Sequence, residues 1–160
     1  MVRAVRPYCQ AMESEDTPTA VLPAHTCWEL LRGIAYGRMA LCVEGQPEIY
    51  PINAQVDHGT LVFRTSEGSK QRAAEGAPVA FEADGVLQDG SRAWSVVIKG
   101  NASTIQRTAE LMSTIHLPLH PWEPGRKDRF MRIVPTSITG RSFDVMPAPQ
   151  LERMPVASEE

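Results

Sequence analysis

Short segments in which apolar and polar residues alternate fill most of the chain between residues 23 and 145. Alternation with a period of two is typical of half-buried β-strands, because successive side chains point to opposite faces of a sheet. Turn-forming residues at 44–47 and 57–59 separate neighbouring segments. The pattern predicts seven strands, over residues 37–44, 48–57, 60–65, 78–87, 92–105, 129–134 and 138–145.

Three short helices are predicted between these strands. The run Thr26-Cys27-Trp28-Glu29 has the form of a capping box, which favours a helix over 27–32 that ends at Gly33. Two further helices are expected over 69–75 and 106–115. The stretch 116–125 contains three prolines, so we expect it to be irregular.

The hairpin-like connections indicate a mostly antiparallel barrel with helices packed outside it. Val96, Val97 and Ile98 are consecutive and apolar, which predicts a strand covered on both faces. In so small a barrel the second cover is often another subunit, so we expect a homodimer. Residues 23–145 form the expected domain, while the proline-containing ends, 1–22 and 146–160, read as flexible tails.

Composition excludes several function classes. The net charge of −3, from 16 basic and 19 acidic residues, argues against sequence-independent nucleic-acid binding. The longest apolar run, Met39–Val43, is far too short to cross a membrane. The three cysteines are widely spaced without a C-x-x-C pair, which argues against a disulfide framework. We therefore expect a cytoplasmic protein.

Several catalytic and cofactor motifs are absent from the chain. It has no G-x-G-x-x-G dinucleotide fingerprint, no P-loop and no G-x-S-x-G elbow. His116 and His120 have the spacing of a helical metal pair, but Pro118 lies between them. We predict no metal site.

The strongest local signal runs from Phe63 to Lys70, where a predicted strand leads through a short loop into a predicted helix. Arg64, Thr65, Ser69 and Lys70 supply a guanidinium, two hydroxyls and an ammonium group, and helix amides add further donors. This combination suits a phosphate monoester. The alternative is a plain helix cap flanked by surface charges.

Two more segments are candidates for contact with a planar cofactor. Pro51 requires its strand to lie at an edge or to be interrupted, which exposes backbone groups beside Asn53. Trp94 could form the wall of a cofactor site with Ser95 as a polar contact, although Trp94 equally suits the core. Trp122 is either a contact with a partner subunit or a loop anchor.

Taken together, these segments resemble the pyridoxamine 5′-phosphate oxidase-like family, the flavin-binding split barrels. The resemblance extends from about Cys27 to Phe143, and the order and spacing of its pieces carry it. The matching pieces are Trp28-Glu29-Leu30-Leu31, Gly37-Arg38-Met39-Ala40, Pro47 to Asn53, Val62-Phe63-Arg64-Thr65, Gly68-Ser69-Lys70, Val79 to Glu82, Ala93 to Gly100, Arg132 to Pro135 and Thr139-Gly140-Arg141.

The resemblance implies a split β-barrel, antiparallel and Greek-key-like, that forms a homodimer with FMN at the subunit interface. It implies that Arg64, Thr65, Ser69 and Lys70 hold the phosphate, and that the isoalloxazine lies along Pro51, Ile52 and Asn53. Trp94 and Ser95 would border the ribityl chain, and Trp122 would approach from the partner. No catalytic side chain is assigned.

The C-terminal block rich in Trp and Arg that a true pyridoxamine phosphate oxidase carries is missing here. The expected activity is therefore that of an FMN-dependent oxidoreductase on another small organic substrate. Two alternatives stay open. One is a non-catalytic flavin- or haem-binding carrier. The other is an F420-dependent reductase, which needs a basic groove such as one lined by Arg126, Lys127, Arg129 and Arg132.

Overall fold

The computed structural model describes residues 19–119 and 127–145, and in these ranges alternating segments form strands as expected. The elements in chain order are β1 (Ala20–Leu22), α1 (Ala24–Arg32), β2 (Gly37–Val43), β3 (Gln46–Ile52), β4 (Ala54–Asp57), β5 (Thr60–Thr65), α2 (Ser69–Ala74), β6 (Pro78–Val86), β7 (Arg92–Thr104), α3 (Thr108–Thr114) and β8 (Arg129–Asp144).

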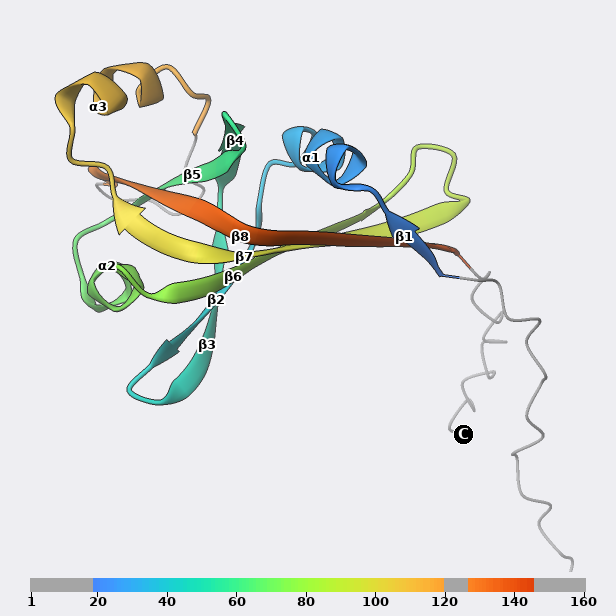
Figure 1. Cartoon of the computed structure of the whole chain (residues 1–160), viewed down its shortest axis with the longest axis horizontal. Helices are drawn as coiled ribbons and strands as arrows, with labels where there is room; N and C mark the ends of the chain where they lie inside the picture. Colours follow the sequence, from blue (N-terminus) through green and yellow to red (C-terminus); the bar gives the residue numbers. More distant parts are fainter. Residues whose placement is uncertain (1–18, 120–126, 146–160) are drawn as a thin grey trace, which may run out of the picture.

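All the strands belong to one antiparallel sheet in the order β3-β2-β6-β7-β8-β5-β4, with β1 added to β8 (Figure 1). β3 and β4 follow each other in sequence but lie at opposite ends of this order. The sheet therefore curls into a split barrel, which confirms the predicted mostly-β fold class.

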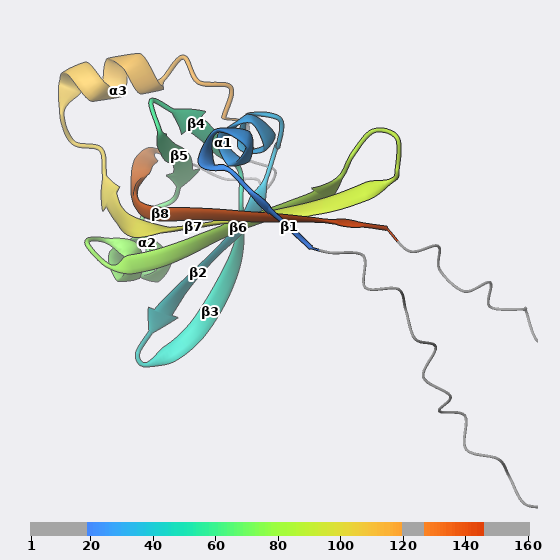
Figure 2. The same cartoon turned by 45° about the vertical axis from the view of Figure 1, so that its right-hand side comes forward.

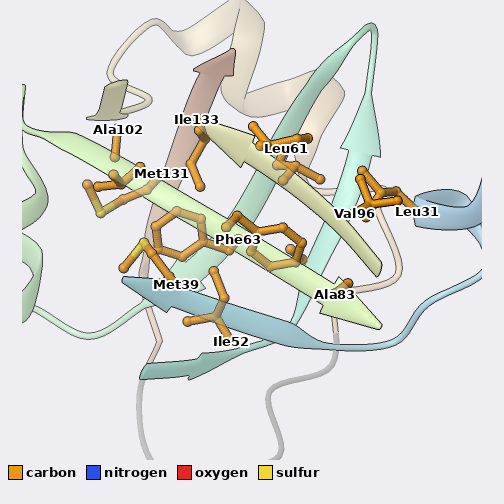
Figure 3. Close-up of a cluster of buried hydrophobic side chains, with 14 of the residues drawn as sticks. Leu31, Met39, Ile52, Leu61, Phe63, Ala83, Val96, Ala102, Met131 and Ile133 are labelled. Atoms are coloured by element: carbon orange, nitrogen blue, oxygen red, sulfur yellow. The ribbon is translucent and has the colours of Figure 1, made fainter. Parts of the chain in front are cut away.

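The inner face of the curled sheet holds the main hydrophobic core. Phe63, Phe81 and Ile98 are almost completely buried there, together with Met39 and Met131 (Figure 3). α1 adds Cys27 and Leu31 to this core, and α2 adds Ala74. Because the side chains of neighbouring strands interdigitate, the barrel interior is packed rather than hollow.

In the part of the chain that the structure describes, one end of the sheet's outer face is covered. Val62 of β5 and Ile105 form a second apolar cluster with Leu119, and Leu111 of α3 packs against it. α3 accordingly stands over the β5 and β8 end of the sheet (Figure 2). Helices of the described ranges leave the outer face of β2, β6 and β7 open.

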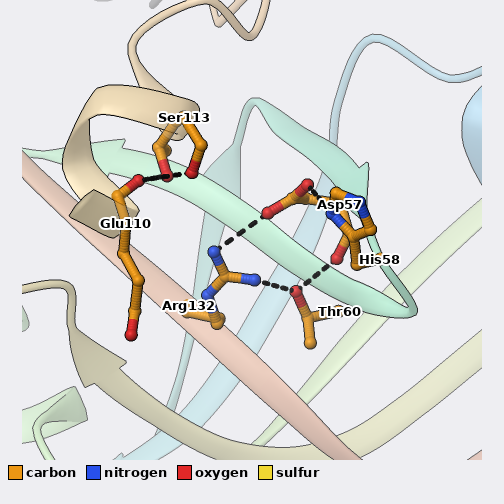
Figure 4. A network of polar contacts seen from close by, with 7 residues as sticks. Asp57, His58, Thr60, Glu110, Ser113 and Arg132 are labelled. Carbon is orange, nitrogen blue, oxygen red and sulfur yellow. Dashed lines mark hydrogen bonds and ion pairs between the residues drawn. The ribbon is translucent and has the colours of Figure 1, made fainter.

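A polar network fixes the β4–β5 hairpin to β8 (Figure 4). The Arg132 guanidinium pairs with the Asp57 carboxylate at 2.9 Å and donates a hydrogen bond to the Thr60 hydroxyl at 2.7 Å. His58, at the turn, contacts the other Asp57 carboxylate oxygen at 2.7 Å. Only 18% of the Arg132 side chain and 15% of the Asp57 side chain are exposed, so solvent screens this pair weakly.

The predicted capping box at the first helix is wrong. α1 begins at Ala24, directly after Pro23, and no side chain caps it. The Cys27 amide instead donates to the Pro23 carbonyl at 3.1 Å, so Thr26 lies within the first turn. Pro23, which lacks an amide hydrogen and has a fixed φ, starts the helix three residues earlier than the polar pattern indicated.

Three strand boundaries also differ from the predicted pattern. The predicted strand 48–57 is interrupted at Asn53, and its first part, β3, is also an edge strand, so both conditions expected of Pro51 are met. β8 runs unbroken through Pro135, because a bulge opposite Lys99 and Gly100 accommodates the proline. β1 lies within the segment 1–22 that the pattern assigned to a tail.

Strict alternation holds at the apolar run in β7. Val96 and Ile98 are fully buried on the inner face, whereas Val97 lies half-buried on the outer face. Three consecutive apolar residues therefore place one valine on the open side of the sheet, beside Thr139 of β8 and Glu82 of β6.

Gly140 is expected to be essential for packing α1 on the sheet. A Cβ at this position would lie 2.5 Å from the Cys27 Sγ atom, so we expect Gly140→Ala to destabilise the protein by about 1–3 kcal/mol. Urea denaturation measures this, with Gly33→Ala as the control because its nearest neighbour would be 3.4 Å away. Adding Cys27→Ala should restore part of the loss. Equal stability of Gly140→Ala and Gly33→Ala would contradict this packing.

Candidate functional site

The predicted phosphate contacts Arg64 and Thr65 project from β5 to opposite faces of the sheet. Thr65 is buried on the inner face, where its hydroxyl donates to the Ser66 carbonyl. The Arg64 Nε atom donates to the Lys127 carbonyl at 2.9 Å, and the guanidinium lies 5.2 Å from the Phe130 ring centroid on the outer face. Adjacent residues of a strand cannot converge on one point, so these two side chains approach any shared ligand from different sides.

Ser69 and Lys70 open helix α2, as the sequence predicted. The next side chains of this helix tie it to the end of β7. The Gln71 amide donates to the Thr104 hydroxyl at 3.0 Å, and the Glu75 carboxylate accepts from the Thr104 amide at 3.0 Å. These bonds hold α2, and Glu75 directly after it, against the end of β7.

The side chains of the three residues expected along the isoalloxazine also do not share one face of the sheet. Pro51 is exposed on the outer face of the edge strand β3, and Ile52 is buried in the core. The Asn53 side chain, at the break between β3 and β4, donates to the Ala35 carbonyl at 3.0 Å. Asn53 therefore holds the connection that follows α1.

Trp94 and Ser95 likewise face opposite ways. Trp94 is 8% exposed and belongs to the main core, where its indole lies against Gly85. It also lines a cavity of about 330 Å³ next to α1. Ser95 faces outward and lines a shallow hollow of about 320 Å³ with Val97, Lys99 and Arg141. Trp122 lies outside the described residues.

Charged side chains gather around this outer hollow. The Arg38 guanidinium pairs with Asp84 at 2.5 Å and with Glu82 at 2.9 Å. The hydrogen bonds that Arg38 donates to Asp84 and then to Glu82 raise the pKa of Arg38, so its guanidinium stays charged. Lys99 and Arg141 form no ion pair with another described residue, so two cations remain open to an anionic group or to an acidic surface.

A further hollow of the structure was not foreseen from the sequence. It has a volume of about 500 Å³, lies between α2, the end of β7 and α3, and is here named the α2–α3 cleft. Its lining residues are Glu67, Gln71, Glu75, Thr104, Ile105, Gln106, Leu111, Asp128, Arg129 and Phe130. They come from four separate segments, so only the three-dimensional fold brings them together.

The basic groove expected for F420 does not form among the described residues. Arg129 pairs with Glu67 at 3.3 Å, and Arg132 is held by Asp57. The cleft beside them is lined by three carboxylates, those of Glu67, Glu75 and Asp128. Arg126 lies outside the described ranges.

The described residues hold neither a metal-binding cluster nor a membrane-spanning helix. No group of three or more His, Cys, Asp or Glu side chains is placed to hold a metal ion in residues 19–119 and 127–145. In the same ranges no helix has the length and apolar character that a bilayer span requires.

Comparisons with known proteins agree with this architecture. The FAD binding protein of Mycobacterium smegmatis is 36% identical, with a TM-score of 0.67 over 78% of this chain and 98% of that one. A Corynebacterium glutamicum structure described as a candidate pyridoxamine 5′-phosphate oxidase is 35% identical, with a TM-score of 0.72 over 80% of this chain and 100% of that one. An uncharacterised Mycobacterium tuberculosis protein is 31% identical over 117 residues, which is 69% of this chain and 76% of that protein.

A family description also covers most of the chain. Residues 23–142 match the pyridoxamine 5′-phosphate oxidase family, and this range includes α1, the whole core and nearly all of β8. The split barrel and the order of its segments are those expected from the resemblance. The chain therefore belongs to the pyridoxamine 5′-phosphate oxidase family.

Proposed function

We propose that this chain is a flavin-dependent oxidoreductase that moves electrons to or from a small organic substrate. Its family membership carries the proposal, together with 36% identity to a protein that binds FAD. FMN is the cofactor we expect for the phosphate contacts at Arg64, Thr65, Ser69 and Lys70, and the FAD binding relative makes FAD the second candidate. A bound flavin would supply the electron chemistry, and the protein would supply binding, orientation and exclusion of water.

The residues of the chain fit such a group chemically. Arg64 offers a guanidinium held in place by Phe130 and by the Lys127 carbonyl, which suits an anionic phosphate. Ser95 on the open face offers a hydroxyl beside the half-buried Val97, which suits a polyol next to an apolar ring. Pro51, exposed on the edge strand, adds a flat apolar surface.

We also propose that two copies of the chain assemble through the open outer face of β2, β6, β7 and β8. Ser95 of β7 and Pro51 of the adjacent edge strand β3 lie on the outer side of the sheet, so a second copy seated on this face would lie next to these two predicted cofactor contacts. The face also carries the acidic pair Glu82 and Asp84 on β6, and Lys99 and Arg141 on β7 and β8. Opposite charges on one face allow a two-fold related copy to pair with it.

The first test is the visible absorption spectrum of the purified protein, followed by mass identification of the molecule that denaturation releases. We expect a flavin spectrum and the release of FMN or FAD. A colourless protein that also takes up neither flavin would overturn the proposal.

Removing either expected phosphate contact should weaken flavin binding. We expect Lys70→Ala and Arg64→Ala each to cost roughly 1.5–3 kcal/mol of FMN binding free energy, the range for hydrogen bonds to charged groups. Quenching of flavin fluorescence on titration measures this. Arg72→Ala is the matched control, because it removes an exposed cation from the same helix. Wild-type affinity in both Lys70→Ala and Arg64→Ala would refute this assignment.

A charge at the centre of the open face should separate the subunits. Val97→Arg places a cation next to Lys99 and Arg141, so we expect light scattering after size exclusion to show a shift from dimer to monomer and a loss of flavin affinity. Met112→Arg is the control, because Met112 is 58% exposed on α3, away from that face. A wild-type monomer, or a Val97→Arg dimer with full affinity, contradicts the proposed interface.

A further inference from the structure

We propose that the cavity between α1 and Trp94 binds a small organic cation, in which an ammonium group is carried on an apolar body. The cavity has a volume of about 330 Å³, near the lower end of the range for small-molecule sites, roughly 300–1,000 Å³. Its described lining residues are Thr26, Glu29, Leu30, Gly33, Ile34 and Trp94. Of these six only Trp94 was expected to contact a flavin, so the proposal does not depend on the proposed oxidoreductase function.

The burial of the lining residues distinguishes the inner wall of the cavity from its mouth. Trp94 is buried, whereas Glu29 and Gly33 are exposed to solvent. Leu30 and Ile34 are half-buried and pack against the main core. A ligand in this cavity would therefore place an apolar group against the indole and a polar group at the mouth.

The charge at the mouth is negative. The Glu29 carboxylate forms no ion pair with another described residue, and no basic side chain is among the described lining residues. Leu30 and Gly33 belong to the last turn of α1 and its C-cap, where the helix dipole adds partial negative charge. Arg32 of the same turn does not line the cavity. The cavity therefore favours a cation and disfavours a phosphate or a carboxylate.

The indole of Trp94 adds a second attraction for the same class of ligand. Tryptophan is the aromatic residue that binds an ammonium group best, and its ring also covers an alkyl or aryl group. This indole belongs to the main core and lies against Gly85, so its position is set before a ligand binds. A preorganised wall lowers the conformational entropy that binding costs. The carboxylate, the helix end and the indole thus agree on an apolar ammonium ion.

The sheet separates this cavity from the proposed cofactor surface. Trp94 points into the core, towards α1, whereas the next residue, Ser95, lines the outer hollow. A ligand against Trp94 and a flavin against Ser95 would therefore lie on opposite sides of β7. A molecule bound in the cavity is not placed to exchange electrons with that flavin, so the site is a separate one.

The test uses 2-phenylethylammonium, with 2-phenylethanol as its neutral isostere and 3-phenylpropionate as an anion of similar size. Each is titrated into the full chain while the ¹H–¹⁵N signals of the Trp94 indole and the Gly33 amide are followed. We expect the ammonium ion to move both signals, and the alcohol to bind about fivefold more weakly, the upper range for an exposed ion pair. The anion should bind more weakly than the alcohol.

Two matched variants test the role of the carboxylate. Glu29→Gln keeps the size of an exposed side chain and removes its charge, so we expect it to abolish the difference between the ammonium ion and the alcohol. Glu44→Gln removes an exposed carboxylate between β2 and β3, away from the cavity, and should leave that difference unchanged. Equal affinity of the wild-type protein for the ammonium ion and the alcohol would overturn the ligand class. Signals of Trp94 and Gly33 that stay fixed in all three titrations would overturn the site.

A titration with FMN separates this inference from the proposed function. If FMN displaces the ammonium ion, the cavity belongs to the cofactor site and the inference is overturned. If both bind together, the cavity is the separate site inferred here. If the protein binds no flavin at all, the proposed function fails, whereas a Glu29-dependent preference for the ammonium ion still supports this inference.

Discussion

The pairing of β7 with β8 is the interaction on which the rest of the molecule depends. Every residue of β7 pairs with β8, and a bulge at Lys99 and Gly100 lets the ladder continue past Pro135. The inner face of the β7–β8 pair contributes to the main core, and α1 packs against β8 at Gly140. Its outer face carries α3 at one end, and no described helix covers the other end. One strand pair therefore positions the core, the cleft and the proposed interface.

Strand alternation also determines how a cofactor can be held. Arg64 with Thr65 and Trp94 with Ser95 are neighbours in sequence, yet each pair is divided between the two faces of the sheet. A ligand that uses both members of such a pair needs groups from inside the barrel and from its outer surface. Within one chain, only the outward-facing members Arg64 and Ser95 lie on the outer surface of the sheet, and Ser95 lines a shallow hollow there.

Features that depend on neighbouring residues were predictable from the sequence. The turns after β2 and β4, helix α2 and most strand boundaries follow from local chemistry. The start of α1 and the unbroken β8 were not, because Pro23 and the bulge at Pro135 depend on the geometry of the backbone and the partner strand. That Arg64 and Thr65 point to opposite faces of the sheet could have been deduced from strand alternation alone. The α2–α3 cleft could not, because four distant segments build it.

The edge strand β3 has a consequence for how the molecule behaves at high concentration. Among the described residues β3 stands at one end of the strand order, and an unpaired edge is the usual template for aggregation. Pro47 and Pro51 remove two amide donors from it, so a foreign strand cannot extend the ladder in register. Pro51, beside the proposed cofactor surface, thus also protects this edge against pairing with a strand of another molecule.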